Sequence, residues 1–210
     1  MDAAEFAATY DVSRETLERL HILVDHLSRW TQKINLIAPG TLEDVWARHI
    51  ADSAQLWELR PERCPSWIDL GSGAGFPGLV IAALSAETGV TAVTLVESDS
   101  RKAAFLTTAA RHMGLHPKVL CARIETLREP PFSVVSARAL ASLPKLLDLA
   151  ERLADSTTIF LFPKGRTART ELTDARRGWH IESTEIASRT EADATILRLT
   201  KIERQNAPNA

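Results

Sequence analysis

The sequence predicts an α/β protein with a mostly parallel seven-stranded sheet and an N-terminal helical extension. Beyond the prolines at 61 and 65, short apolar runs alternate with helical stretches. Strands that alternate with helices imply right-handed crossovers and a mainly parallel sheet. A glycine-rich turn joins the first of these strands to the next helix. The chain has 210 residues, 45% of them apolar and 25% charged, which suits one domain with an appendage.

The first 60 residues are predicted to be helical. Ser13 can cap a helix start with its hydroxyl. Apolar residues then recur at spacings of three and four, which is one face of an amphipathic helix: Leu17, Leu20, Val24 and Leu27. Pro39-Gly40 breaks the chain, a second helical stretch follows over 42–59, and the prolines of 60–65 predict a linker. The expected parts are a helical extension over 1–62, a main domain over 63–204 and a tail over 205–210.

The main domain is predicted to alternate strands with helices. We expect strands at 67–70, 93–96, 119–121, 134–136 and 158–162. We expect helices at 78–86, 100–113, 143–153 and 168–176. Two last strands, at 179–183 and 195–200, would close the sheet as a hairpin-like edge.

Several classes of protein are disfavoured by composition. The two cysteines, Cys64 and Cys121, and the lack of a CxxC or Cys/His ligand spacing predict reduced thiols and no metal site. The longest apolar run, 79–84, is far shorter than the roughly 20 residues of a membrane span. Asp2 and Glu5 stand where a signal peptide would carry basic residues. We therefore expect a soluble, cytoplasmic protein without membrane association.

The net charge of −2 conceals an uneven distribution of charge. Residues 1–60 carry six Lys and Arg against ten Asp and Glu, whereas residues 101–177 carry 14 against seven. The total alone disfavours nucleic-acid binding, because domains that bind nucleic acids are often strongly basic. The basic middle of the chain is nevertheless the kind of electrostatic footprint that an RNA substrate would need.

Residues 67–78 contain the segment that carries most of the chemistry. A strand ending near Asp69 runs into a turn with four glycines and then into a helix, with Pro77 near the first helical position. Glycines allow positive φ and let a ligand approach the backbone closely. Residues 73–78 fit GxGxxG, the fingerprint of dinucleotide-binding loops, in which a pyrophosphate rests on the helix N-terminus. A structural turn without a ligand is the simplest alternative.

A second ligand, S-adenosylmethionine, competes with the dinucleotide. It carries an α-amino group and a sulfonium, so the carboxylate of Asp69 would suit it, whereas that carboxylate would sit badly beside a pyrophosphate. Glu97, about 20 residues beyond the loop, is placed to accept hydrogen bonds from ribose hydroxyls. Both cofactors use such an acid, so Glu97 does not discriminate between them, and Asp69 favours S-adenosylmethionine.

With these residues in view, the sequence resembles the small-subunit ribosomal RNA methyltransferase G family, also called glucose-inhibited division protein B. Residues 69–78 (DLGSGAGFPG) resemble the family signature. Other segments match in the same order: Asn35-Leu36, residues 48–53 (RHIADS), 123–125 (RIE), 136–139 (SARA) with Ala141, and Lys164-Gly165. The resemblance covers roughly residues 25–180 and is far more specific than GxGxxG alone.

The resemblance implies a Rossmann-like class I methyltransferase that uses S-adenosylmethionine to methylate N7 of one guanine in 16S rRNA. Its substrate would be RNA in the small ribosomal subunit or a precursor. Its cofactor positions fall on Gly71, Phe76, Ile124, Glu125 and Arg138, beside the Asp69, Gly73 and Glu97 singled out above. Ile124-Glu125 could bracket the adenine, and Arg138 could meet the cofactor carboxylate or lie between cofactor and guanine. Basic residues near strand C-termini are candidate RNA contacts: Arg123, Arg138, Lys164 and Arg166.

Guanine N7 has an exposed lone pair, so the reaction needs no general base, and we name no catalytic residue. His49 and Asp52 share a helix face at i and i+3, which predicts a packing and hydrogen-bonding pair more readily than a catalytic one. One departure concerns the arginine that the family places before the last strand, since residues 191–195 contain none. Arg189 or Arg198 could replace it.

Two other functions stay open at this point. One is a methyltransferase of similar fold that acts on a small molecule or a protein, and the other is an NAD-binding module. The sequence offers no obvious interface helix, so we expect a monomer.

Overall fold

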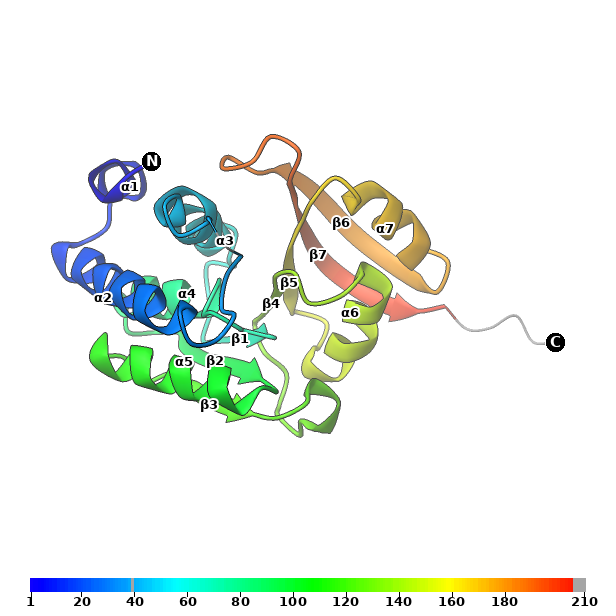
Figure 1. Cartoon of the computed structure of the whole chain (residues 1–210). Helices are drawn as coiled ribbons and strands as arrows, with labels where there is room; N and C mark the ends of the chain where they lie inside the picture. Colours follow the sequence, from blue (N-terminus) through cyan, green and yellow to red (C-terminus); the bar gives the residue numbers. More distant parts are fainter. Residues whose placement is uncertain (39, 206–210) are drawn as a thin grey trace.

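The computed structural model describes residues 1–38 and 40–205, and within them a seven-stranded sheet forms the centre of the molecule (Figure 1). The strands are β1 (Ser66–Leu70), β2 (Ala92–Glu97), β3 (Lys118–Cys121), β4 (Val134–Ala137), β5 (Ile159–Lys164), β6 (Trp179–Ala187) and β7 (Thr195–Arg204). All seven predicted strands are confirmed, and β6 and β7 each extend four residues further than predicted.

The strand order is β3-β2-β1-β4-β5-β7-β6. The first five strands are parallel, and β7 inserts antiparallel between β5 and β6. The predicted hairpin-like edge is thereby confirmed, with a bulge between Glu182 and Ser183. Because β1 to β5 are parallel, their C-terminal ends lie along one edge of the sheet, where ligands bind in folds of this type.

The helices of the main domain follow the sequence pattern closely. They are α4 (Gly78–Ser85), α5 (Ser100–His112), α6 (Leu143–Ala150) with a short 3₁₀ turn (Glu151–Leu153), and α7 (Ala168–Ala175). Another 3₁₀ turn (Ile124–Thr126) follows β3. Helix α4 begins at Gly78, so Pro77 is its cap and not its first residue as expected.

The N-terminal extension differs from the prediction in two elements. Helix α1 (Ala3–Tyr10) lies in the stretch predicted to be helical, although no separate helix was predicted before Ser13; Asp2 and Glu5 form a capping box at its start. Helix α2 (Arg14–Thr31) begins after Ser13, whose hydroxyl accepts from the Thr16 N–H at 3.1 Å, as predicted. The stretch predicted as one helix over 42–59 is a π-helical turn (Trp46–Ala51) followed by α3 (Asp52–Glu58). Pro39 lies outside the described residues.

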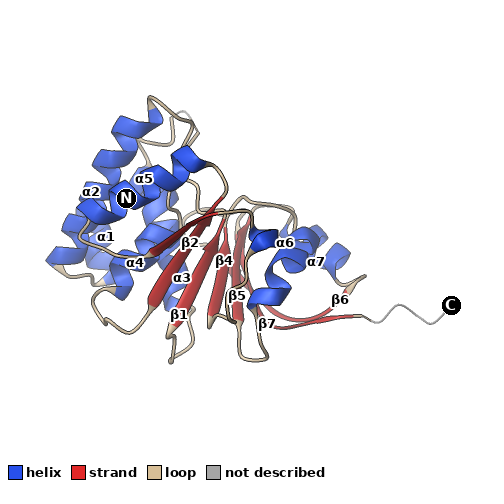
Figure 2. Ribbon diagram, turned by 90° about the horizontal axis from the view of Figure 1, so that it is seen from below, coloured by secondary structure: helices blue, strands red, loops and turns tan. Residues whose placement is uncertain are grey.

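Side chains alternate between the two faces of the sheet, and each face has its own core. Helices cover both faces of the sheet (Figure 2). Trp67 of β1 packs on the face covered by α4 and α5, whereas Ile68 packs on the face covered by α6 and α7. Leu20 and Leu27 of α2 belong to the first of these cores. The residues before the predicted boundary near residue 62 therefore share a hydrophobic core with the residues after it.

Two further predictions concern membrane-spanning helices and the C-terminal tail. Helices in the described residues are all too short or too polar to cross a membrane. Gln205, placed in the predicted tail, is fixed: its N–H donates to the Gly178 carbonyl at 3.0 Å. The rest of the tail, 206–210, lies outside the described residues.

Candidate functional site

The glycine loop lies between β1 and α4, at the C-terminal edge of the sheet. Gly71, Gly73 and Gly75 have φ values of +66°, +53° and +88°, which L side chains adopt only with strain. The Ser72 N–H donates to the Val96 carbonyl at 2.9 Å, which anchors the turn to β2. Around Gly73, a Cβ atom would come no closer than 3.7 Å to any neighbour, so its backbone is open to a ligand.

Asp69, expected to meet a cationic ligand directly, is fully buried beneath this loop. Its Oδ2 accepts from the Gly78 N–H at 3.2 Å, and its Oδ1 accepts from the Ser136 hydroxyl at 2.8 Å. Burial raises the pKa of Asp69 to about 6, although these hydrogen bonds act in the opposite direction. In this arrangement Asp69 ties the start of α4 to β4, so its effect on a ligand would pass through the loop and not through direct contact.

Glu97, at the end of β2, supports the loop from the other side. Its Oε2 accepts from the Gly73 N–H at 2.9 Å, and its Oε1 accepts from the Asp99 N–H at 2.8 Å. A carboxylate has about four lone-pair directions, so two remain for ligand hydroxyls. The side chain thus shapes the loop and keeps accepting capacity toward the adjacent cavity.

A cavity of about 350 Å³ adjoins the loop and brings together six of the predicted residues. They are Gly71, Gly73, Glu97, Arg123, Ile124 and Glu125. The apolar Ile124 and two acidic groups suit an adenosine: a flat apolar contact, acceptors for hydroxyls and an acceptor for an amine. These residues, drawn from β1, β2 and the turn after β3, fit the adenosine end of S-adenosylmethionine.

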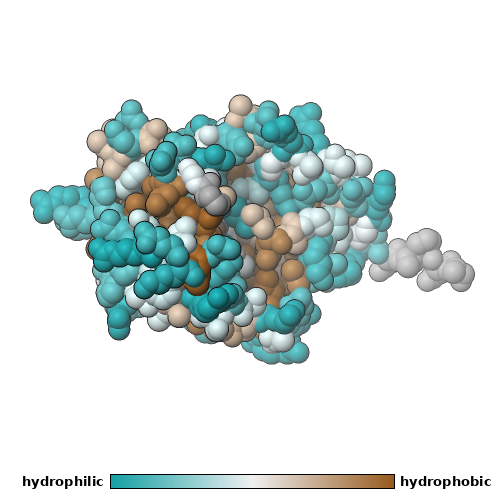
Figure 3. Space-filling view, in the orientation of Figure 1, coloured by the Kyte–Doolittle hydropathy of each residue, from teal (hydrophilic) through white to brown (hydrophobic). Residues whose placement is uncertain are grey.

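A larger cavity, of about 740 Å³, lies on the other side of the β4–α6 loop. Ala139 and Leu140 line both cavities, so one elongated ligand could reach from the smaller into the larger. The walls of the larger cavity include Leu36 and Ile37 from the N-terminal extension and Glu191 from the β6–β7 loop. Apolar side chains reach the surface in the middle of the face shown in Figure 3, within a polar surround. Residues from both predicted parts of the chain build this cavity.

Arg138 forms part of the wall of the larger cavity and is bonded to the N-terminal extension. Its Nη1 donates to Asp52 Oδ2 at 3.2 Å and to the Arg48 carbonyl at 3.2 Å, and its Nη2 faces His49 Nδ1 at 3.0 Å. The guanidinium also lies 5.4 Å from the centre of the Phe76 ring, on which His49 stacks at 5.0 Å. Phe76 itself is 4% exposed, so it reaches the site mainly through these two neighbours.

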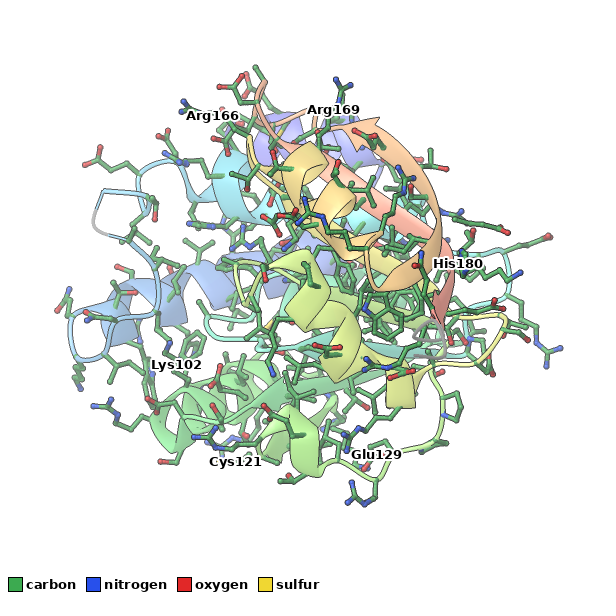
Figure 4. The ribbon with its side chains drawn as sticks, turned by 90° about the vertical axis from the view of Figure 1, so that its right-hand side faces the viewer. Lys102, Cys121, Glu129, Arg166, Arg169 and His180 are labelled. Atoms are coloured by element: carbon green, nitrogen blue, oxygen red, sulfur yellow. The ribbon has the colours of Figure 1, made fainter. Side chains whose placement is uncertain are left out.

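The two remaining basic candidates occupy different environments. Lys164 lines the larger cavity, and its Nζ donates to Glu171 Oε2 at 2.8 Å and to the Ala141 carbonyl at 2.7 Å. Burial alone would raise the pKa of Glu171, but hydrogen bonds, chiefly from Lys164, outweigh it and hold the pKa below its usual value. Arg166 and Arg169 both project outward at the top of the view in Figure 4, and Arg166 is paired with Asp193 at 3.3 Å. Lys164 is therefore part of the site wall, and Arg166 belongs to its exposed surroundings.

Sequence reasoning left the arginine before β7 unresolved. Arg189 pairs with Glu58, and the Nε of Arg198 donates to the Leu59 carbonyl at 3.3 Å, so both face the N-terminal extension. Arg48, in contrast, is exposed and lines the larger cavity. The motif that contains Arg48 was visible in the sequence, but nothing in it indicated contact with the β4–α6 loop.

His49 and Asp52, which were expected to hydrogen-bond to each other, both bond Arg138 instead. The two side chains contact Arg138 from different sides, with no hydrogen bond between them among the described residues. Cys64 and Cys121 are both free, the first buried and the second exposed at the end of β3 (Figure 4).

The solved structures that share this architecture include methyltransferases. A SAM-dependent methyltransferase from Aquifex aeolicus matches with a TM-score of 0.61 at 13% identity, over 83% of this chain and 98% of the other. An SAH-bound methyltransferase from Podospora anserina matches with a TM-score of 0.60 at 12% identity, over 90% of this chain and 97% of the other. The fold is that of the class I S-adenosylmethionine-dependent methyltransferases.

Sequence similarity narrows this class to a family. Residues 16–199 match the family described as rRNA small subunit methyltransferase G. A protein of that name from Rhodospirillum centenum is 52% identical over 95% of this chain and 91% of its own length. Another from Ruegeria sp. is 47% identical over 92% of this chain and 95% of its own length. The chain belongs to the rRNA small subunit methyltransferase G family.

Proposed function

We propose that this protein transfers the methyl group of S-adenosylmethionine to N7 of a guanine in small-subunit ribosomal RNA. The observation that carries the proposal is the pair of adjoining cavities that share Ala139 and Leu140 as lining. The smaller has the donors and acceptors for an adenosine, and the larger has the room and the cationic wall for a nucleotide. The family's name supplies the nature of the substrate.

The chemistry asks little of the side chains beyond positioning. Guanine N7 carries an exposed lone pair, so no proton has to be removed before it attacks. S-adenosylmethionine, when bound, supplies the methyl group and a sulfur leaving group. The walls of the two cavities would hold the bound cofactor and the base in the orientation for transfer, and such positioning accounts for much of the rate of comparable reactions. Glu97 and Ile124 would fix the adenosine, and the walls of the larger cavity would fix the base.

Charge supports the assignment of the larger cavity to the base. Methylation at N7 leaves a positive charge on the guanine, and an unpaired cation beside it would oppose the reaction. Arg138 has Asp52 at 3.2 Å, and Lys164 has Glu171 at 2.8 Å. Both cations are thereby balanced, yet they keep N–H groups that can act as donors toward a base or phosphate.

The RNA would meet a broader basic surface around the cavities. Arg123 lines the smaller cavity, and Arg166 directly follows Gly165, which lines the larger one. Lys102 also lines the smaller cavity, on the same side of the molecule as Cys121 in Figure 4. Phosphate contacts from such residues give affinity without sequence preference, which leaves selection of the target to the cavity and to RNA shape.

The proposal is tested by following a tritiated methyl group from S-adenosylmethionine into undermethylated small ribosomal subunits. We expect label in the RNA fraction and none in the ribosomal proteins; label only in protein would indicate the alternative protein methyltransferase. Gly71→Arg is the matched control, because Gly71 has φ +66° and an added Cβ would lie 2.6 Å from Leu140 Cδ1. Calorimetry completes the test, and binding of NAD without binding of S-adenosylmethionine would overturn the cofactor assignment.

A further inference from the structure

His49 is held between two elements that lie far apart in the sequence. Its Nδ1 faces Arg138 Nη2 at 3.0 Å, and its Nε2 faces the Thr41 hydroxyl at 3.1 Å. The ring is stacked on Phe76, with 20° between the two planes. His49 lines the larger cavity, and these contacts occupy both of its ring nitrogens, so neither is free to exchange a proton with a substrate.

The hydrogen-bond directions fix the protonation of the ring. A guanidinium has only donors, so Nδ1 of His49 must be the unprotonated acceptor. The Thr41 hydroxyl donates its own proton to the Ala38 carbonyl at 2.9 Å, which leaves its lone pairs to accept from the Nε2–H. Both ring nitrogens are therefore assigned: the neutral form with hydrogen on Nε2 is the one that satisfies every partner.

The surrounding charges act in the same direction. Burial, followed by the positive charges of Arg138 and Arg48, lowers the pKa of His49 to about 4. A second proton would set an N–H against the N–H of the guanidinium. At neutral pH the ring consequently stays uncharged.

Hydrogen bonds also fix the Nη1 side of the Arg138 guanidinium. Asp52 accepts from Nη1 through Oδ2, and its Oδ1 accepts from the Thr190 hydroxyl at 3.0 Å. One chain of hydrogen bonds thus links Thr41, the loop after β4 and the β6–β7 loop, which lie on three sides of the larger cavity. The Nε–H and one Nη2–H of Arg138 have no acceptor among the described residues.

We propose that His49 is a positioning residue that, as a neutral acceptor through Nδ1, fixes the Arg138 guanidinium so that its two remaining N–H groups are presented to a ligand in the larger cavity. The ligand group would be an oxygen acceptor with two lone pairs, such as a carboxylate, a phosphate or the O6 of guanine. His49 is not a general base in this arrangement, because the lone pair that would take a proton is occupied by Arg138. The activity measurement below rests on the proposed function.

Two amide substitutions distinguish this hydrogen-bonding role from a role in packing alone. In His49→Asn the amide oxygen can occupy the place of Nδ1, whereas in His49→Gln the amide reaches the place of Nε2. A hydrogen bond to a charged group is worth enough that His49→Ala should lower kcat/KM about ten- to a hundredfold. We expect His49→Asn to recover most of the activity and His49→Gln to recover little. Equal activities of the two, or better activity of His49→Gln, would overturn the proposal.

A spectroscopic measurement tests the same claim without methyl transfer. In ¹⁵N NMR at neutral pH, His49 should show an unprotonated Nδ1 and a protonated Nε2, with its signals assigned by their absence from His49→Asn. An Nδ1–H tautomer or an imidazolium would contradict the proposal even if the enzyme is active. A lack of RNA methylation together with the expected tautomer would instead refute the proposed function alone. His116→Ala, at an exposed site outside both cavities, is the matched control and should leave activity unchanged.

Discussion

Replacing Gly78 with alanine tests how closely α4 must approach the sheet. Gly78 is the first residue of α4, and its φ is not positive, so the only obstacle to a side chain is space. An added Cβ would overlap Leu95 Cδ2 and would lie 2.7 Å from Asp69 Oδ2. Both neighbours are fully buried in β2 and β1 and have little room to move.

The expected cost follows from two opposing effects. Forcing an extra methyl group into a packed core costs about 1–3 kcal/mol, and the better helix propensity of alanine returns up to about 1 kcal/mol. With the middle of the first range, about 2 kcal/mol, the net loss is about 1–2 kcal/mol. In a chain of this length each kcal/mol lowers Tm by about 2–4 °C. Gly78→Ala should therefore lower Tm by about 2–8 °C. Because the Gly78 N–H also bonds Asp69, the affinity for S-adenosylmethionine should fall as well.

Thermal unfolding followed by circular dichroism measures the loss of stability, and calorimetry measures the affinity for the cofactor. Gly178→Ala is the matched control, since no atom lies within 4 Å of a Cβ added there and its φ is not positive. The reasoning would be refuted if the Tm of Gly78→Ala were no lower than that of Gly178→Ala. An unchanged affinity beside a lowered Tm would refute only the link from Gly78 through Asp69 to the loop.

Three further predictions concern other parts of the chain. The raised pKa of Asp69, about 6, means that its contribution to stability is present at acid pH and lost as the pH rises through 6, so Asp69→Asn should remove that dependence from urea unfolding between pH 4 and 7. Ser13→Ala should cost about 1 kcal/mol by removing the cap of α2, measured as a lowered urea midpoint. Arg123→Gln and Arg166→Gln should each reduce the salt slope of RNA binding by about one, measured by filter binding, whereas Arg14→Gln on α2 should not.

The inner part of the fold could be predicted because β1, β2, β4 and most of β5 are buried on both faces. Such strands appear in the sequence as short apolar runs, and turn residues separate them from the helices. Helix α1 was not predicted as a separate element, because it has eight residues and a single fully buried side chain, Phe6. The residues of its capping box, Asp2 and Glu5, are visible in the sequence, but a capping box followed by one short turn pattern does not define a helix by itself. The π-helical turn was missed because a one-residue change in period leaves no distinct pattern in six residues.

The site could be predicted in part. Physical reasons separate the residues that could be predicted from those that could not. Parallel strands bring their C-terminal ends together, so the meeting of Gly71, Glu97 and Ile124 follows from local patterns and topology. The complete burial of Asp69 could not be predicted from the sequence, because the position of a residue on a strand does not reveal which groups its carboxylate will bond. The contact of Arg138 with residues 48–52 joins segments almost 90 positions apart, and a single sequence carries no signal of such a pairing.

The central claim is that the adjoining cavities join the methyl group of S-adenosylmethionine to N7 of a guanine in small-subunit rRNA. Nucleoside mass spectrometry of that rRNA, after incubation of undermethylated subunits with the protein and S-adenosylmethionine, tests it most directly. The predicted result is the appearance of 7-methylguanosine, absent when Gly71→Arg replaces the wild type. Methylation at another atom or another base, or no methylated nucleoside at all, would contradict the account.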